Sequence, residues 1–156
     1  MQSFVLLIWL ALCAAQDVQQ RHISNRLTLG VGGLALAYLF WSGLTWLGAS
    51  AEQGGWALAL ALAFTLPGYA SGRMGAGDVK LMATIGLATE PVHLLGSFIG
   101  AGVASVLWLL LAPRLWPHIA QGLRKSIPYL APDLSKNPPF APFVLIGMLV
   151  TMLCLQ

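Results

Sequence analysis

The sequence predicts an all-α integral membrane protein with about six transmembrane helices. Hydrophobic residues make up 58% of the chain, charged residues make up only 8%, and the mean hydropathy is +0.78. Soluble domains contain about 25% charged residues, so this composition excludes an ordinary soluble enzyme. The 156 residues predict a single membrane-embedded domain over 1–156, because the apolar segments use most of the chain.

Six apolar segments follow one another along the chain. They are Ser3–Ala15, Leu27–Gly48, Gly54–Tyr69, Val79–Thr89, Val92–Leu111 and Phe140–Leu155. Only the second and fifth reach the roughly 20 residues that cross a hydrocarbon core, but we expect the first, third and sixth to cross as well. The fourth is the shortest, so we expect neighbouring helices or local bilayer thinning to shelter it. The first segment lacks the basic start of a signal peptide and is predicted to be retained.

The distribution of charge between these segments predicts the topology. Three loops and their edges contain all eight basic residues: Arg21, Arg26, Arg73, Lys80, Arg114, Arg124, Lys125 and Lys136. The other two loops contain Glu52 and Glu90 and no basic residue. The positive-inside tendency therefore predicts six crossings with both termini outside, and Glu90 with Pro91 forming the turn between the fourth and fifth helices. Since no basic cluster lies apart from the membrane, the net charge of +3 does not predict nucleic-acid binding.

The long loop after the fifth segment has an apolar pattern of its own. Trp116, Ile119, Leu123 and Ile127 recur at helical spacing, with polar residues between them. This pattern predicts a short amphipathic helix in the headgroup layer. A loop that only follows the membrane surface fits the same residues equally well.

Two carboxylates, Asp17 and Asp78, lie at the predicted cytoplasmic ends of helices. Charged residues at membrane level are costly and usually functional. Two acids within a few Å of each other cannot both ionise, so one can accept a proton from water while the other donates one. Because such a titration belongs to the pair, neither acid is assigned as the base. Each acid alone also has a structural interpretation: Asp17 pairing with Arg21, and Asp78 capping the fourth helix or pairing with Lys80.

The residues around both acids resemble motifs of a known family. Asp78 lies in Gly75-Ala76-Gly77-Asp78-Val79-Lys80-Leu81, which is similar to the signature of the type IV prepilin peptidases, membrane aspartic proteases of the GxGD class. Asp17, followed by Arg21-His22-Ile23-Ser24-Asn25, resembles the family's first motif. Pro139-Phe140-Ala141-Pro142-Phe143, with Gly147, resembles the motif of its last helix. Ser24 replaces the family's usual proline, and we expect this to loosen the turn after the first helix.

The resemblance implies an aspartic endopeptidase with Asp17 and Asp78 as the catalytic pair. It implies cleavage of the leader of type IV (Flp-type) prepilins or pseudopilins at the cytoplasmic face of the bacterial inner membrane. It implies an active-site motif that contains Gly75, Gly77 and Lys80. It also implies that Arg21, Asn25 and Arg73 are possible contacts to the substrate or to lipid. No metal, cofactor or nucleic acid is expected.

The chain is similar to the short members that serve tight-adherence pili. The larger, bifunctional members contain a cytoplasmic domain with zinc-binding cysteine pairs and also methylate the mature pilin. Here Cys13 and Cys154 both fall within predicted helices, near opposite ends of the chain. Neither zinc binding nor methyl transfer is therefore implied.

Two other classes of function remain open from the sequence. A small proton-coupled carrier also uses intramembrane carboxylates, but its acids are expected near the bilayer midplane and its two halves are expected to match. A non-catalytic membrane assembly factor is the weaker alternative.

Overall fold

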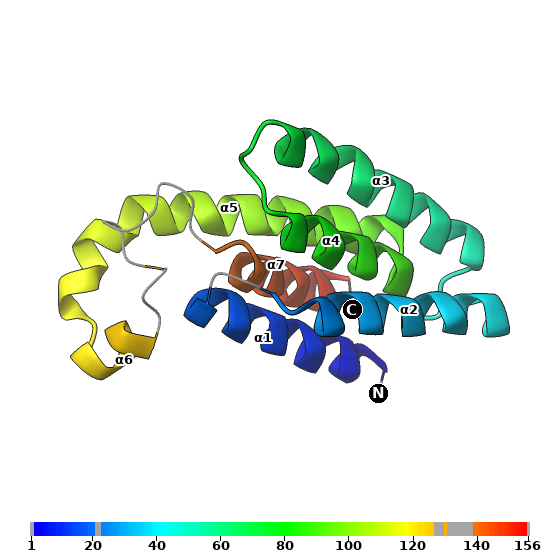
Figure 1. Cartoon of the computed structure of the whole chain (residues 1–156), viewed down its shortest axis with the longest axis horizontal. Coiled ribbons are helices and arrows are strands. Elements are labelled where there is room, and N and C mark those ends of the chain that lie inside the picture. Colours follow the sequence, from blue (N-terminus) through cyan, green and yellow to red (C-terminus); the bar gives the residue numbers. More distant parts are fainter. Residues whose placement is uncertain (1, 21–22, 127–129, 131–138, 156) are drawn as a thin grey trace.

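The computed structural model describes residues 2–20, 23–126, 130 and 139–155, and this part of the chain is helical (Figure 1). Its elements are α1 (Gln2–Gln20), α2 (Asn25–Ser42), α3 (Ala51–Ala70), α4 (Ala76–Ala88), α5 (Pro91–Leu115), the 3₁₀ helix η1 (Trp116–His118), α6 (Gln121–Ser126) and α7 (Ala141–Cys154). The only β-type pairing in these residues is an isolated bridge between Leu44 and Ser50. The predicted all-α fold is confirmed.

The six long helices form a bundle in which consecutive helices run in alternating directions (Figure 1). Helix α4 packs against both α2 and α3, while α7 packs between α1 and α5. This arrangement brings the end of α1 and the starts of α2, α4 and α7 to the same end of the bundle (Figure 1).

Helix α4 is short, and it lies inside the bundle. Leu81, Met82 and Ile85 have no solvent exposure, so its apolar face is covered by protein. A Cβ added at Gly86 would lie 2.9 Å from the main-chain carbonyl of Ala57, so glycine permits the close crossing of α3 and α4. The prediction that neighbouring helices shelter the fourth segment is confirmed.

The outer surface of the bundle is strongly apolar. Phe40, Trp41 and Leu110 are exposed by 83%, 93% and 67%, which in water would be unfavourable. Among the described residues, two helices are long and apolar enough to span a membrane, over Ser3–Gln20 and Pro91–His118, and α7 is apolar but shorter. Six crossings therefore stay a prediction.

The second predicted segment, Leu27–Gly48, is too long at its C-terminal end. Helix α2 ends at Ser42, because Gly43 adopts a left-handed conformation with φ of 70° and its N–H bonds to the carbonyl of Leu39. The apolar residues that follow belong to a turn, in which the N–H of Thr45 donates to the carbonyl of Ala49. Hydropathy alone does not separate such a turn from a helix.

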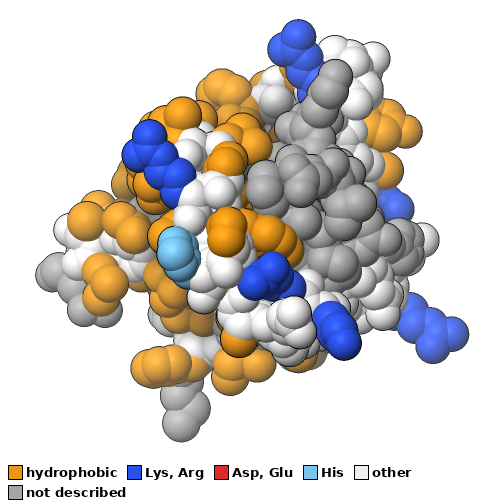
Figure 2. Space-filling view, turned by 90° about the vertical axis from the view of Figure 1, so that its left-hand side faces the viewer, with side chains coloured by type: hydrophobic (Ala, Val, Ile, Leu, Met, Phe, Trp, Pro, Cys, Tyr) orange, Lys and Arg blue, Asp and Glu red, His pale blue; other side chains and the backbone are white. Residues whose placement is uncertain are grey.

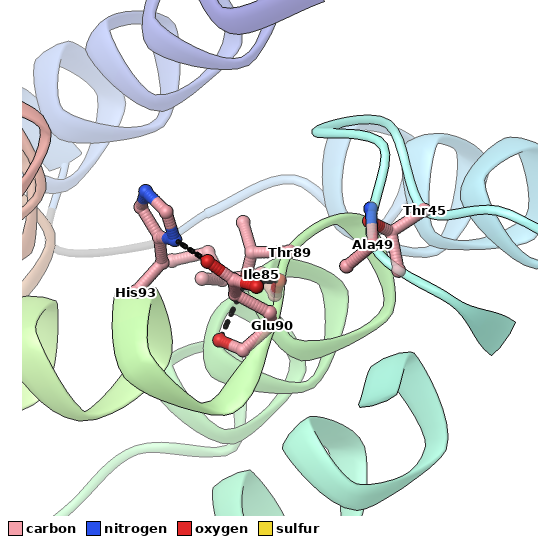
Figure 3. Close-up of polar contacts among 6 residues, drawn as sticks. All are labelled: Thr45, Ala49, Ile85, Thr89, Glu90 and His93. Carbon is pink, nitrogen blue, oxygen red and sulfur yellow. Dashed lines mark hydrogen bonds and ion pairs between the residues drawn. The ribbon is translucent and has the colours of Figure 1, made fainter. Parts of the chain in front are cut away.

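The predicted turn between the fourth and fifth segments is confirmed. Glu90 precedes α5 and Pro91 is its first residue, where the missing N–H of proline costs nothing. The Nδ1 atom of His93 lies 2.8 Å from Oε1 of Glu90, and the hydroxyl of Thr89 donates to the carbonyl of Ile85 (Figure 3). The turn after α2 is fixed to this end of the bundle, because the N–H of Leu47 donates to the carbonyl of Ala88.

The loop after α5 does not form the single amphipathic helix suggested by its periodicity. Residues Trp116–His118 form η1, and a new helix, α6, begins at Gln121. Between them Ile119 has an extended backbone, with φ of −78° and ψ of 137°. Arg124 donates from Nε to the carbonyl of Ile119 and from Nη2 to that of Pro117, which fixes the bend. Ile127 lies outside the described residues.

The described basic residues gather at one end of the bundle. They lie at the start of α2, between α3 and α4, in the second turn of α4, in the last turn of α5 and in α6. Figure 2 shows this end, with Lys and Arg side chains spread over it and no acidic side chain among its coloured atoms. Glu52 and Glu90 lie at the opposite end, at the starts of α3 and α5.

Candidate active site

Asp17 lies near the end of a buried stripe on α1. The stripe consists of Leu6, Trp9, Leu10, Cys13, Ala14, Asp17 and Val18, which recur at the spacing of one helix face. This face packs against α7, and Asp17 is only 5% exposed. Its Oδ2 atom accepts a hydrogen bond of 3.0 Å from the main-chain N–H of Ala141, the first residue of α7.

Asp78 lies in the first turn of α4. Its Oδ2 atom accepts from the N–H of Gly75 at 3.3 Å, so the carboxylate caps its own helix. The interpretation that Asp78 caps the fourth helix is therefore confirmed. The cap does not exclude chemistry, because the side chain is only partly buried.

The two glycines before Asp78 leave space beside it. A Cβ at Gly75 would lie 3.6 Å from Oδ2 of Asp78, and one at Gly77 would lie 3.8 Å from the Cβ of Ile23. Both are ordinary van der Waals distances. Within the described residues, no main-chain atom of another segment lies within 4 Å of either added Cβ. The space that the glycines leave is thus not filled by a neighbouring helix.

Polar contacts hold the start of α4 against the start of α2. The Nζ atom of Lys80 donates to Oδ1 of Asn25 at 2.8 Å, and one turn later the hydroxyl of Thr84 donates to the carbonyl of Thr28. A Cβ added at Gly77 would lie 3.8 Å from the Cβ of Ile23, so Ile23 lies close to this side of α4 as well. Lys80 and Asn25, assigned separately in the sequence, therefore act together in positioning α4.

Ser24 bonds to groups on both sides of the turn after α1, and the expected loosening relative to proline stays a prediction. Its side chain accepts from the N–H of Arg26 and caps α2, and its own N–H donates to Oε1 of Gln16 at 3.0 Å. A proline at this position would lack that N–H. Serine therefore takes part in two hydrogen bonds here, one through its N–H and one through its side chain.

The structure places Asp17 and Asp78 at the same end of the bundle, one at the end of α1 and one at the start of α4. A Cβ added at Gly77, next to Asp78, would lie 3.8 Å from the Cβ of Ile23, so the chain between α1 and α2 passes close to the start of α4. The hydrogen bonds described for the carboxylates go to α7 and to the first turn of α4, respectively. A proton shared between the two acids stays a prediction.

Of the two arginines predicted to contact substrate or lipid, the structure describes one. Arg73 is exposed in the loop between α3 and α4, and Arg21 lies outside the described residues. A groove of about 250 Å³ lies between α1 and α6, lined by Ala14, Ala15, Val18, Gln19 and Ser126. In the described part of the chain, no three His, Cys, Asp or Glu side chains are grouped so as to hold a metal ion.

The hydrogen bond between Asp17 and Ala141 could not be predicted from the sequence. The donor is a main-chain N–H, so it does not depend on the type of side chain at position 141, and the two residues are 124 positions apart. The proline-rich motif around Ala141 marked the segment but gave no reason for its importance.

Comparison with known proteins identifies the family. The model of the type IV leader peptidase family matches residues 4–110, more than half of the chain, and this range includes both Asp17 and Asp78. No curated protein and no solved structure matches the chain. The family match does not favour the carrier alternative, and together with the apolar helices it leads to one conclusion: the chain belongs to the type IV leader peptidase family and is a membrane peptidase.

Proposed function

We propose that this protein is an aspartic endopeptidase that removes the leader peptide of prepilins or pseudopilins. The observation that supports this most directly is that Asp17 and Asp78 both lie within the family match and at the same end of the bundle. Asp17 is almost fully buried in a membrane protein, where an acid without a function is disfavoured.

In the proposed mechanism the two carboxyl groups share one proton. The ionised acid takes a proton from a water molecule, whose oxygen attacks the carbonyl carbon of the scissile bond. The protonated acid donates its proton to the carbonyl oxygen, which gives a tetrahedral intermediate with two hydroxyl groups. As the C–N bond breaks, the first acid passes the proton taken from water to the leaving amine, and one hydroxyl of the intermediate returns a proton to the second acid as the new carboxyl group forms. The two acids together end with the single proton with which they began, so the pair is ready for another cycle.

The proposed substrate segment approaches along the first turn of α4. An extended peptide needs access to the carboxylates over its main chain, and Gly75 and Gly77 leave space beside Asp78. Arg73 is exposed nearby and can bind a lipid phosphate or an acidic substrate residue. Asn25 and Lys80 already bond to each other, so we assign them to positioning α4 rather than to direct substrate binding.

We propose that the basic end of the bundle faces the cytoplasm. Under the positive-inside tendency this places both acids near the cytoplasmic face and both termini outside, with six crossings of the inner membrane. Leader peptides of this family's substrates are basic and cytoplasmic, so the site and its substrate then lie on the same side.

Reporter fusions test this orientation. Fusions after Glu52 and Glu90 are expected to be active only as periplasmic reporters, and fusions after Arg73 and Arg124 only as cytoplasmic ones. Alkaline phosphatase and green fluorescent protein, fused at the same positions, serve as matched controls for each other. A periplasmic result after Arg124 would show that α4 and α5 do not cross separately.

Co-expression with candidate prepilins tests the activity and its limits. Intact mass measurement of the pilin is expected to show loss of the leader and a free N-terminal amine without an added methyl group. The reason is that the longest loop of the chain, the one after the fifth apolar segment, contains no glycine-rich cradle for a nucleotide-like methyl donor. Metal chelators are expected to leave cleavage intact, since Cys13 is buried in α1 and Cys154 ends α7. A methyl increment that requires this protein, or inhibition by chelators, would contradict these expectations.

A further inference from the structure

Helix α7 lies outside the residues that the family model matches, yet its first residue bonds to Asp17. The family match ends at residue 110 and α7 begins at Ala141. Its first N–H donates to Oδ2 of Asp17 at 3.0 Å, and Ala141 has no solvent exposure while Asp17 has 5%. A hydrogen bond to an ionised carboxylate is roughly twice as strong as one between neutral groups.

The main-chain donors of the first turn of α7 show that this contact is specific. The first N–H groups of any helix lack partners within the helix and need others. Pro142 has no N–H, and the N–H groups of Phe143 and Val144 both donate to the carbonyl of Phe140. The N–H of Ala141 is thus the donor of this turn that reaches across to another helix, and Asp17 accepts it.

Close packing fixes the position of this donor. A Cβ added at Gly147 would overlap the main chain of α5 at Ser97 and would lie 2.8 Å from the nitrogen of Ala101. One added at Gly100 would lie 2.6 Å from the Cα of Gly147. Since these helices touch along their backbones, α7 cannot slide along α5, and its first turn is held at a set height beside α1.

We propose that α7 completes the active site by holding the carboxylate of Asp17 through the main-chain N–H of Ala141. This inference rests on the proposed function, in which Asp17 acts on the hydrolytic water or the scissile bond. Ala141 is a positioning residue: it orients Oδ2 and so fixes the direction in which the rest of the carboxylate faces. The helix N-terminus also favours negative charge at this oxygen.

A change of a single main-chain atom tests the proposal. Ala141 is replaced by L-lactic acid through nonsense suppression in cell-free synthesis with lipid nanodiscs, which exchanges the N–H for an oxygen and keeps the methyl group. The kcat for cleavage of a purified prepilin is expected to fall by about tenfold or more with KM changed less than about threefold, as for loss of a hydrogen bond to a charged group. The matched control is the α-hydroxy analogue of valine at Val144, which removes an ordinary helical hydrogen bond in the same turn. It is expected to reduce kcat by less than about twofold.

A thermal unfolding cycle provides a second readout that does not need activity. The ester at position 141 is expected to lower the Tm of the unsubstituted protein by several degrees more than it lowers that of Asp17→Ala, in which the acceptor is absent. Equal Tm losses in both backgrounds, or a kcat for the ester at 141 no lower than that of the Val144 control, would overturn the proposal. Failure of the unsubstituted protein to cleave any prepilin would count against the proposed function instead, and the cycle would still decide whether the contact exists.

Discussion

Asp17→Asn and Asp78→Asn are each expected to abolish leader removal while leaving the amount of protein in the membrane nearly unchanged. Asparagine has almost the same shape as aspartate and keeps an oxygen that can accept from Ala141 or Gly75. Its amide cannot exchange a proton in this pH range, so general acid–base catalysis, which typically contributes about 10²–10⁴-fold, is lost. Mass measurement of a co-expressed prepilin, with quantification of the peptidase by immunoblot, gives both readouts.

The other acids of the chain provide the controls for this experiment. Glu52 lies in the first turn of α3 at the opposite end of the bundle, so Glu52→Gln is expected to remain active. Asp133→Asn, outside the described residues, is likewise expected to remain active. Substantial cleavage by either the Asp17 or the Asp78 variant would exclude the aspartic mechanism, whichever of the two retained it.

Gly147→Ala is expected to destabilise the protein more than any other single methyl group added to α7. The new Cβ would overlap the main chain of α5 at Ser97 and approach the nitrogen of Ala101 to 2.8 Å. Main chain cannot rotate away as a side chain can, so the two helices must separate. Overpacking of this kind costs about 1–3 kcal/mol or more. Thermal unfolding in detergent, followed by helical circular dichroism, measures the loss.

Helix α5 contains a matched control for this change. Gly102 lies two positions after Gly100, and a Cβ added there would meet nothing within 4 Å. Gly102→Ala is therefore expected to leave the Tm unchanged or raise it, because alanine favours helix over glycine by about 1 kcal/mol. A Tm for Gly147→Ala equal to that of Gly102→Ala would show that α5 and α7 are not in main-chain contact.

The order of the helices was predictable because it follows from the apolar segments and from the residues that start and end helices. Glu90 and Pro91 marked the division between α4 and α5, since proline is favoured in a first turn and disfavoured inside a helix. The end of α2 was not predictable in the same way. Trp46 and Leu47 are apolar and continue the hydropathy of the segment, but Gly43 has already turned the chain. The left-handed conformation at Gly43 depends on its surroundings, and most other glycines of this chain do not adopt it.

The candidate site was predictable where its chemistry lies in side chains. Asp17 and Asp78 stood out because carboxylates at membrane level are costly. The hydrogen bond between Asp17 and α7 was not predictable. It depends on the register of α7 against α5 and on a main-chain N–H that almost any residue supplies. The pairing of Lys80 with Asn25 was similarly hidden, because it depends on the register between α2 and α4.

The unequal lengths of the helices have a consequence for the surrounding lipid. Helix α5 has 25 residues, whereas α4 and α7 have 13 and 14. At about 1.5 Å per residue they measure roughly 38, 20 and 21 Å. At the end where Asp17 and Asp78 lie, α5 continues past the first turns of α4 and α7 (Figure 1).

A bilayer whose thickness matches the length of α5 is therefore thicker than the two short helices are long. In the proposed orientation α4 is enclosed by its neighbours, so the acyl chains that adapt are those beside α7, and we expect the cytoplasmic leaflet to form a dent near the carboxylates. Such a dent gives the hydrolytic water a path to a site that would otherwise be dry. The access of water to the carboxylates thus depends on the length of the lipid chains, because longer chains fill the dent and shorter ones widen it.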